Sequence, residues 1–306
     1  MSAHANVIEQ LRSLRLPDAK AEYMTQLADA SYDSLGFSER LDLVLTAELA
    51  ARRTRRVQRR LKEANLRVSA HKEEFYFDSD RGITRPELAE LASLSFMASG
   101  RSVIISGATG CGKTYLACIL GTEAATRELT VRYHRTSELI ERLAIARAEG
   151  TMRSVLSFYR KLDLLLLDDF GLSAVPVSAS RELLEILDER SETASTVIAS
   201  QFPPESFPRL IEDPTAADAI CDRITAGAIV VSLTGESMRR LKSRAQVADV
   251  GARWQLEPTP RVEVRTGRHS FGVRIFLPPR LSRNRPIRQR RGSLGPTRRA
   301  GLPSAG

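Results

Sequence analysis

Apolar residues recur at helical spacing near the amino end of the chain, first at Val7, Leu11 and Leu14 and later at Leu41, Leu45 and Leu49. This period predicts amphipathic helices. Pro17 ends the first run, because proline cannot continue a helix. A second helix is expected over residues 18–30, and a third begins at Ser38.

From about residue 100 the pattern changes to short runs of β-branched and apolar residues that alternate with helical stretches. The predicted strands cover residues 101–106, 130–134, 161–167, 195–201 and 228–233. The third run contains four consecutive leucines bounded by polar residues, which is typical of a central strand buried on both faces. A helix over residues 86–98 leads into this region, and we place a domain boundary near residue 70.

The first of these strands runs into a glycine-rich loop, S-G-A-T-G-C-G-K-T, over residues 106–114. Strand, glycine loop and helix form the phosphate-binding arrangement G-x-x-x-x-G-K-[ST]. Its backbone N–H groups and the helix dipole would hold the phosphates, Lys113 would reach the β- and γ-phosphates, and Thr114 would bind Mg²⁺. The predicted ATP-binding residues are Gly107, Ala108, Thr109, Gly110, Cys111, Gly112, Lys113 and Thr114. The alternative is a glycine-rich turn that binds nothing.

Polar side chains follow two further strands at their carboxyl ends, where an α/β sheet binds its ligand. Asp168 would hold Mg²⁺, directly or through water, and Asp169 would orient the attacking water and accept its proton. Taken alone, the acid pair could instead cap the next helix. Either Gln201 or Ser200 would point at the γ-phosphate if its strand lies between the other two.

Charge is distributed unevenly over the 306 residues. Residues 244–306 contain fourteen arginines and three acids, a balance of +11, so the rest of the chain carries −2 of the net +9. Clustered Pro, Gly and Arg in residues 247–306 indicate a disordered tail. We favour an accidental extension over a dedicated DNA-binding arm, and in both cases the charge of +11 would bind DNA nonspecifically.

The third helix carries seven basic charges in the eleven residues 52–62. This face could lie along a DNA backbone, or it could be a solvated surface paired with acids elsewhere. The candidate DNA-binding residues are Arg52, Arg53, Arg55, Arg56, Arg59 and Arg60. Beyond this helix, the aromatic run from Phe75 to Phe77 could stack on a base or pack against the next domain.

Composition excludes several other classes of protein. Three cysteines without C-x-x-C spacing and four histidines make a zinc site or a disulfide framework improbable. The amino end lacks a long apolar run, and no stretch approaches 18 apolar residues. We therefore expect no signal peptide, no membrane span and a reduced cytoplasmic setting.

Taken together, the phosphate loop, the acid pair, the polar end of the fourth strand, D-R-I at residues 222–224 and G-E-S-M-R at residues 235–239 resemble the AAA+ ATPases. The opening L-R-S-L-R-L-P, F-S-E-R-L before the basic helix, and F-Y-F-D at residues 75–78 narrow the resemblance to the IstB/DnaC group, and within it to IstB-like helper ATPases of insertion sequences.

This resemblance implies an α/β fold with a five-stranded parallel sheet of order 5-1-4-3-2 and a small all-α N-terminal domain. The expected division is a DNA- or partner-binding domain over residues 1–70, an AAA+ ATPase domain over 71–246, and the tail. It also implies a homo-oligomer on double-stranded DNA that recruits a transposase and hydrolyses ATP with Mg²⁺. Gln201 takes the first sensor position, Arg223 the position of an arginine inserted into a neighbouring subunit, and Arg239 the second sensor position.

Two other functions share the phosphate loop. A DnaC-type loader would bind a replicative helicase instead of a transposase. A small-molecule kinase would need a phosphoacceptor pocket and would have no need of Arg223, whose alternative role is a surface salt bridge.

Overall fold

The computed structural model describes residues 2–77, 81–238, 240, 263–266 and 269–272. The chain divides into two compact units, Met1–Val247 and Ala248–Gly306. In the described part of the chain, no helix combines the length and apolar character needed to span a lipid bilayer.

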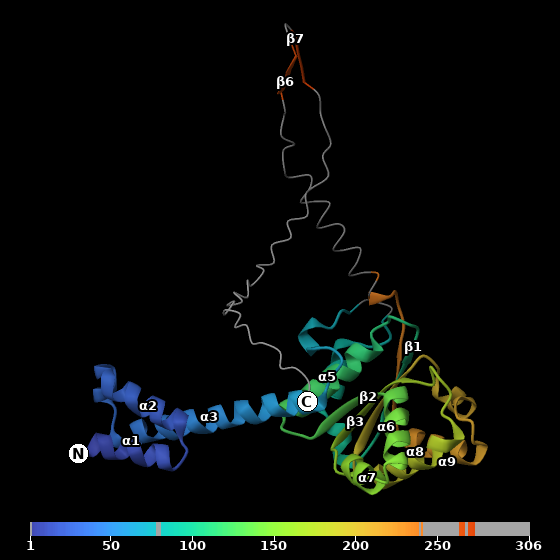
Figure 1. Ribbon diagram of the computed structural model, residues 1–306, viewed down its shortest axis with the longest axis horizontal. Coiled ribbons are helices and arrows are strands. Elements are labelled where there is room, and N and C mark those ends of the chain that lie inside the picture. Colours follow the sequence, from blue (N-terminus) through green and yellow to red (C-terminus); the bar gives the residue numbers. More distant parts are fainter. Residues whose placement is uncertain (1, 78–80, 239, 241–262, 267–268, 273–306) are drawn as a thin grey trace, which may run out of the picture. The chain divides into compact units, whose positions relative to one another are not determined.

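The N-terminal helices are α1 Ala3–Ser13, α2 Pro17–Ala28 and α3 Phe37–Ala64 (Figure 1). Pro17 begins α2 and does not merely end α1, since its fixed φ suits the first helical position. At the start of α3, Gly36 and not Ser38 is the N-cap, and the Glu39 carboxylate accepts a hydrogen bond from the Gly36 N–H at 2.7 Å.

A buried acid fastens α2 to α3. The Glu48 carboxylate on α3 is 4% exposed and accepts hydrogen bonds from the backbone N–H groups of Asp18 and Ala19, at 2.9 and 3.2 Å. These donors lie in the first turn of α2, where backbone N–H groups have no acceptor within the helix itself. These two hydrogen bonds hold the start of α2 against α3.

The remaining elements of the first unit build the predicted sheet. Its strands are β1 Val103–Gly107, β2 Val131–Arg135, β3 Leu164–Phe170, β4 Ser195–Ser200 and β5 Ile229–Leu233. The helices are α4 Arg85–Ser93, α5 Lys113–Thr126, α6 Thr136–Ala148, α7 Met152–Arg160, α8 Val177–Arg190 and α9 Pro214–Thr225. Short 3₁₀ helices are Ala30–Ser34, Lys72–Glu74, Ser95–Ser99 and Pro204–Leu210.

All strand pairs of this sheet are parallel, and the strand order is β2-β3-β4-β1-β5. The α/β fold with sheet order 5-1-4-3-2 predicted for an AAA+ ATPase is confirmed. Because β4 lies between β1 and β3, the carboxyl ends of the loop strand, the acid strand and the Gln201 strand meet at one edge.

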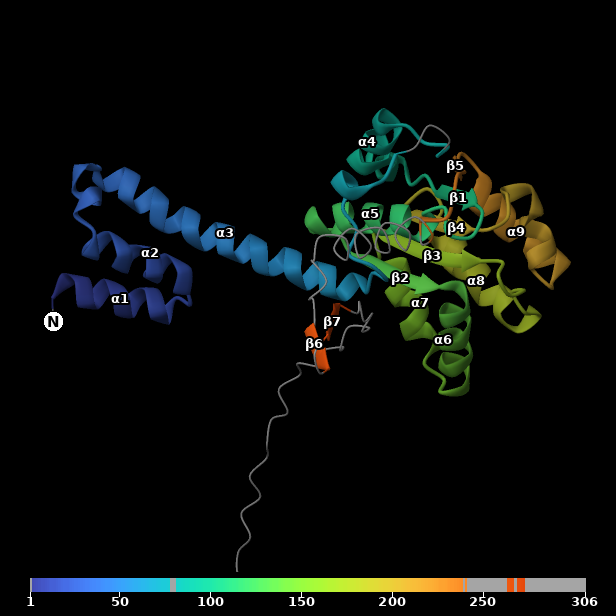
Figure 2. The same cartoon turned by 90° about the horizontal axis from the view of Figure 1, so that it is seen from above.

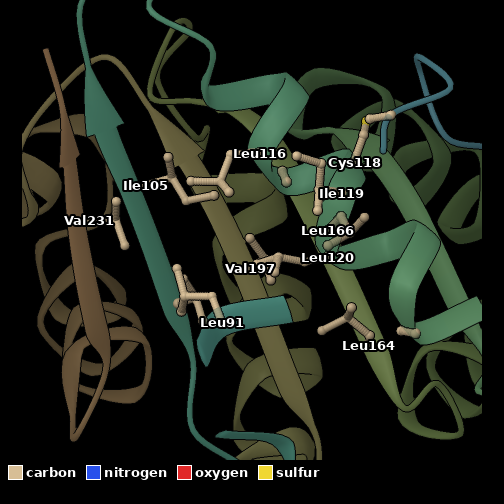
Figure 3. Close-up of a cluster of buried hydrophobic side chains, with 14 of the residues drawn as sticks. Leu91, Ile105, Leu116, Cys118, Ile119, Leu120, Leu164, Leu166, Val197 and Val231 are labelled. Atoms are coloured by element: carbon tan, nitrogen blue, oxygen red, sulfur yellow. The ribbon is translucent and has the colours of Figure 1, made fainter. Parts of the chain in front are cut away.

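Both faces of the sheet are covered. Leu116, Ile119 and Leu120 of α5 face Ile105, Leu166 and Val197 of the sheet (Figure 3). The alternate residues of the same strands, among them Ile104, Leu165 and Ile198, pack in the second apolar cluster with residues of α6, α8 and α9. Figure 2 shows α5 and α6–α8 on either side of the sheet. This two-sided burial explains the unbroken run of leucines in β3.

The tail differs in part from the prediction. Its described residues form an antiparallel pair, β6 Glu263–Thr266 and β7 His269–Gly272, where we expected no regular structure. Two runs of four residues are too short for a period of two to stand out among prolines and arginines. The other tail residues, and Arg239, lie outside the described residues.

Candidate nucleotide site

The phosphate loop joins β1 to α5 in a backbone shape that requires glycine. Gly107 has φ 145°, and a Cβ there would lie 2.1 Å from the Leu233 carbonyl oxygen at the end of β5. Gly110 has φ 89°, and a Cβ there would meet Ser237 Oγ at 2.3 Å. Both positions require glycine, because the backbone is left-handed and the neighbouring atoms leave no room for a Cβ. The side chain of Cys111 is 1% exposed and fills space in the core.

Lys113 folds back over this loop. Its Nζ donates to the carbonyl oxygens of Gly107 and Ala108 at 2.8 and 2.9 Å, and the side chain is nearly buried. These bonds keep the ammonium group beside the loop. The backbone N–H groups at the start of α5 point toward the same place. The arrangement concentrates positive charge where phosphate oxygens would bind.

The two acids at the end of β3 point in different directions. Asp168 is 1% exposed, whereas Asp169 lines the cleft. Asp169 has φ 56°, and the register with β4 shifts between Leu167 and Phe170. This bulge turns Asp169 outward, a common way for a strand end to redirect a side chain. Strain at a non-glycine residue of this kind is typical of functional positions.

Asp168 is held by hydroxyl groups on both sides. Its Oδ2 accepts hydrogen bonds from Thr114 Oγ1 at 2.7 Å and Tyr133 Oη at 2.8 Å, and its Oδ1 accepts from the Asp169 N–H at 2.9 Å. Burial, followed by the hydrogen bond to Asp168, raises the pKa of Tyr133, so its hydroxyl remains a donor. Tyr133 was missed from the sequence, where it is simply one residue of a short predicted strand.

The sites predicted for Mg²⁺ are therefore adjacent. Thr114 and Asp168 supply a hydroxyl and a carboxylate oxygen, the hard donors that Mg²⁺ prefers. Among the described residues, no group of three or more His, Cys, Asp and Glu is placed to hold a metal ion. A cation here would complete its shell with phosphate oxygens and water, which fits a metal that arrives with a nucleotide.

Most of the remaining predicted groups line the same cleft. Its wall includes the predicted residues Lys113, Thr114, Asp169 and Gln201, and also Arg67, which the sequence did not single out. Ser200 does not, because its hydroxyl is fully buried and donates to the Phe170 carbonyl oxygen at 2.8 Å. Of the two alternatives at the end of β4, Gln201 is thus the one that faces the nucleotide site.

A smaller apolar pocket adjoins the loop. Tyr76, Tyr115 and Met238 line it together with Cys111 and Gly112. Phe75 also contributes, but its ring is buried and packs on Phe77 with centroids 5.0 Å apart. Phe75 thus packs in the core, which was one of the two alternatives, while the half-exposed Tyr76 lines the pocket beside the loop.

Arg223 lies apart from this cleft. On α9 it forms ion pairs with Asp188 at 2.7 Å and Asp222 at 2.9 Å, and its side chain is 40% exposed. It borders a different pocket with Ser102 and Thr196, which lie at the amino ends of β1 and β4. The structure therefore does not bring Arg223 to the phosphate loop of its own chain.

Each arginine of the basic helix has an acidic partner within 4 Å. Arg52 pairs with Glu48, Arg55 with Asp18, Arg53 and Arg56 with Glu128, and Arg59 and Arg60 with Glu63. Four acids thus face six arginines, so the face keeps a smaller excess of positive charge than the sequence implied. Exposed pairs of this kind contribute about 0–1 kcal/mol each.

Comparison with known proteins agrees with this geometry. The sequence profile of the family described as IstB-like ATP binding protein matches residues 8–246. The chain is 34% identical to a protein of Sinorhizobium fredii named as an insertion sequence ATP-binding protein, y4pL, over 80% of this chain and 99% of that one. It is 38% identical to the corresponding protein named for insertion sequence IS1162 of Pseudomonas fluorescens, over 65% and 86% of the two chains.

Among solved structures, the DnaC helicase loader superposes with a TM-score of 0.44 at 19% identity, over 54% of this chain and 97% of that one. DnaI gives a TM-score of 0.47 at 24% identity, over 58% and 94% of the two chains.

Proposed function

Since the chain belongs to the family of IstB-like ATP binding proteins of insertion sequences, we propose that it is a DNA-activated ATPase that assists transposition. It would bind ATP with Mg²⁺, assemble into a homo-oligomer on double-stranded DNA, and recruit the transposase. The observation that carries this proposal is the convergence of Lys113, Thr114, Asp169 and Gln201 on one cleft, with Arg223 held elsewhere.

The chemistry follows from these positions. Lys113 and the loop N–H groups bind the phosphates, and Thr114 with Asp168 would hold Mg²⁺, which neutralises charge on the β- and γ-phosphates when bound. Asp169 orients a water molecule in line with the γ-phosphate and accepts its proton, while Gln201 donates a hydrogen bond to that water. Tyr76 and Tyr115 offer flat surfaces to the base.

Assembly would complete this site. Transfer of the γ-phosphoryl group builds up charge that a further cation must stabilise. Arg223 is exposed on the far edge of the sheet, so it is available to a neighbouring subunit and not to its own nucleotide. Hydrolysis would then depend on oligomerisation, and DNA would stimulate it by gathering the subunits.

A mixing experiment tests this arrangement. Arg223→Ala protein should bind ATP normally and lose about 1000-fold in DNA-stimulated hydrolysis, as expected for an arginine supplied in trans. Lys113→Ala protein should be inactive at ATP concentrations that just saturate the parent, because its affinity for ATP is much lower. Mixed together, the two variants should regain activity, since each Lys113→Ala subunit can offer its intact Arg223 to the intact cleft of a neighbour.

Arg160→Ala is the matched control, because Arg160 is another exposed arginine paired with an acid, Glu189, and lies on α7. It should leave hydrolysis unchanged. Normal hydrolysis by monomeric Arg223→Ala protein would exclude the intersubunit site. For the partner, co-purification with the transposase is expected, and capture of a replicative helicase alone would favour the loader function.

A further inference from the structure

Arg67 reaches the two acids of the cleft from the segment just beyond α3. Its Nη1 atom lies 3.5 Å from Asp168 Oδ2 and 3.4 Å from Asp169 Oδ2. The side chain is 30% exposed and lines the same cleft as Lys113 and Thr114. No motif in the sequence singled it out, because it belongs neither to the phosphate loop nor to the run of arginines in α3.

The acids need a positive charge at this place. Two neighbouring carboxylates repel each other, and a carboxylate as buried as Asp168 is costly without a counter-ion. Lys113 Nζ is engaged with loop carbonyl groups, and Arg135 approaches only Asp169, at 3.9 Å. Within the part of the chain that the structure describes, Arg67 is the cation within ion-pair distance of Asp168.

Arg67 uses the oxygen that the metal would use. Asp168 Oδ2 accepts the hydroxyl hydrogen of Thr114, and the same atom faces the Arg67 guanidinium. Mg²⁺ requires oxygen ligands at about 2.0–2.1 Å in nearly octahedral positions. A guanidinium group 3.5 Å from one of those oxygens both blocks a ligand position and repels the ion.

We propose, on the basis of the function proposed above, that Arg67 is an internal stand-in for Mg²⁺. It neutralises Asp168 and Asp169 until Mg²⁺ enters with the nucleotide, and the ion then displaces the guanidinium from Asp168. Arg67 is thus a regulatory residue of the nucleotide site and not a catalytic one.

Arg67 follows closely after the end of the basic helix α3. α3 ends at Ala64, and Asn65 follows in the left-handed conformation with φ 52°. Leu66 then packs so closely on α5 that a Cβ at Gly121 would lie 2.7 Å from its side chain. Arg67 comes next, so the segment that leaves Asp168 is continuous with the basic helix. Binding of Mg²⁺ with nucleotide would therefore loosen residues 66–68, the segment that follows α3.

Nucleotide affinity with and without the metal tests the stand-in. The probe is AMPPCP, a non-hydrolysable ATP analogue, whose Kd is measured by calorimetry in Mg²⁺ and in EDTA. In Arg67→Gln protein the ion no longer has to displace a guanidinium, so AMPPCP should bind about 10-fold more tightly than in the parent in Mg²⁺. In EDTA the variant should bind no more tightly than the parent.

Two further variants control for side effects. Arg67→Lys keeps the charge and should behave like the parent. Arg135→Gln removes a neighbouring positive charge that approaches only Asp169, and should change the Kd in Mg²⁺ by less than about 2-fold. Equal or weaker binding of AMPPCP by Arg67→Gln protein in Mg²⁺ would overturn this inference and leave the proposed function unaffected. Failure of the parent protein to bind AMPPCP at all would overturn the proposed function, and the inference with it.

Amide hydrogen exchange tests the loosening of the segment that follows α3. In the parent protein, addition of Mg²⁺ with AMPPCP should speed exchange at residues 66–68. In Arg67→Gln protein these amides should already exchange faster, and the addition should change them little. Unchanged or slower exchange in the parent upon addition would show that Arg67 does not hold this segment to the cleft.

Discussion

The nucleotide cleft and the basic helix α3 are both built from facing charges, but the charges are used differently. In the cleft, Asp168 is 1% exposed and every contact to its oxygens comes from another element of the fold or from the next residue. On α3, the arginines are largely exposed and pair with acids such as Glu63 and Glu128 at the surface. Buried charge must be matched atom by atom, whereas surface charge exchanges partners freely with solvent.

The two regions therefore differ in how they can bind a ligand. The cleft brings Lys113, Thr114 and Asp169 together, so under the proposed function a nucleotide would meet groups that are already assembled. The helix presents arginines that already have partners, so DNA would have to compete with Glu63, Glu128 and Asp18 for them. Loss of one group should therefore be severe in the cleft and mild on the helix, and the binding of DNA should depend on salt.

The largest effect is expected at Lys113. Lys113→Ala removes the ammonium group from the loop and leaves the carbonyl oxygens of Gly107 and Ala108 without their donor. Hydrogen bonds to charged groups contribute about 1.5–3 kcal/mol, so ATP affinity should fall by up to about 100-fold in equilibrium binding. Lys161→Ala, at an exposed lysine, should bind as the parent does. Similar losses in both variants would contradict the contrast between buried and exposed charge.

A smaller effect is expected from the burial of His134 in β2. His134 of β2 is 9% exposed and bonds to Tyr159 at 2.9 Å, and burial, followed by Arg132 and Arg142, lowers the pKa of His134 to about 4. The unfolded chain takes up this proton near pH 6.5 and the folded protein only near pH 4. The contribution of His134 is thus present above pH 6.5 and is lost as the pH falls toward 4.

Denaturant unfolding between pH 4 and 8 measures this dependence. From pH 7 to pH 4 the free energy of unfolding should fall by about 1–2 kcal/mol more in the parent than in His134→Gln protein. Stability curves of the two proteins that remain parallel over this range would show that the folded protein accepts the proton without cost.

The smallest effect is expected on the helix. Glu128→Gln frees Arg53 and Arg56 from their shared partner, so affinity for double-stranded DNA should rise about 2- to 3-fold at low salt. The gain should disappear at high salt, as measured by fluorescence anisotropy on a labelled duplex. Glu141→Gln removes an exposed acid on α6 and is the matched control. An equal gain in that control would show that net charge alone, and not the α3 arginines, governs binding.

Much of the sheet and the cleft could be predicted because their signals are local. The four leucines of β3 reflect burial on both faces, and the glycines of the loop reflect backbone shapes that other residues cannot adopt. The contributions of Tyr133 and Arg67 were missed because neither has a local signal. Tyr133 bonds to Asp168 only through the parallel pairing of β2 with β3, and Arg67 reaches it across 101 residues of sequence.

The sequence by itself determined where a nucleotide would bind and which strand would carry the acids, because Gly107, Lys113 and Asp168 belong to patterns set by nearest neighbours along the chain. Only the tertiary structure decided how charge is shared. It paired the α3 arginines with acids, kept Arg223 away from its own loop, and brought Arg67 within ion-pair distance of both Asp168 and Asp169. The physical reason is that electrostatic energy depends on distance and burial in space, which a list of residues does not contain.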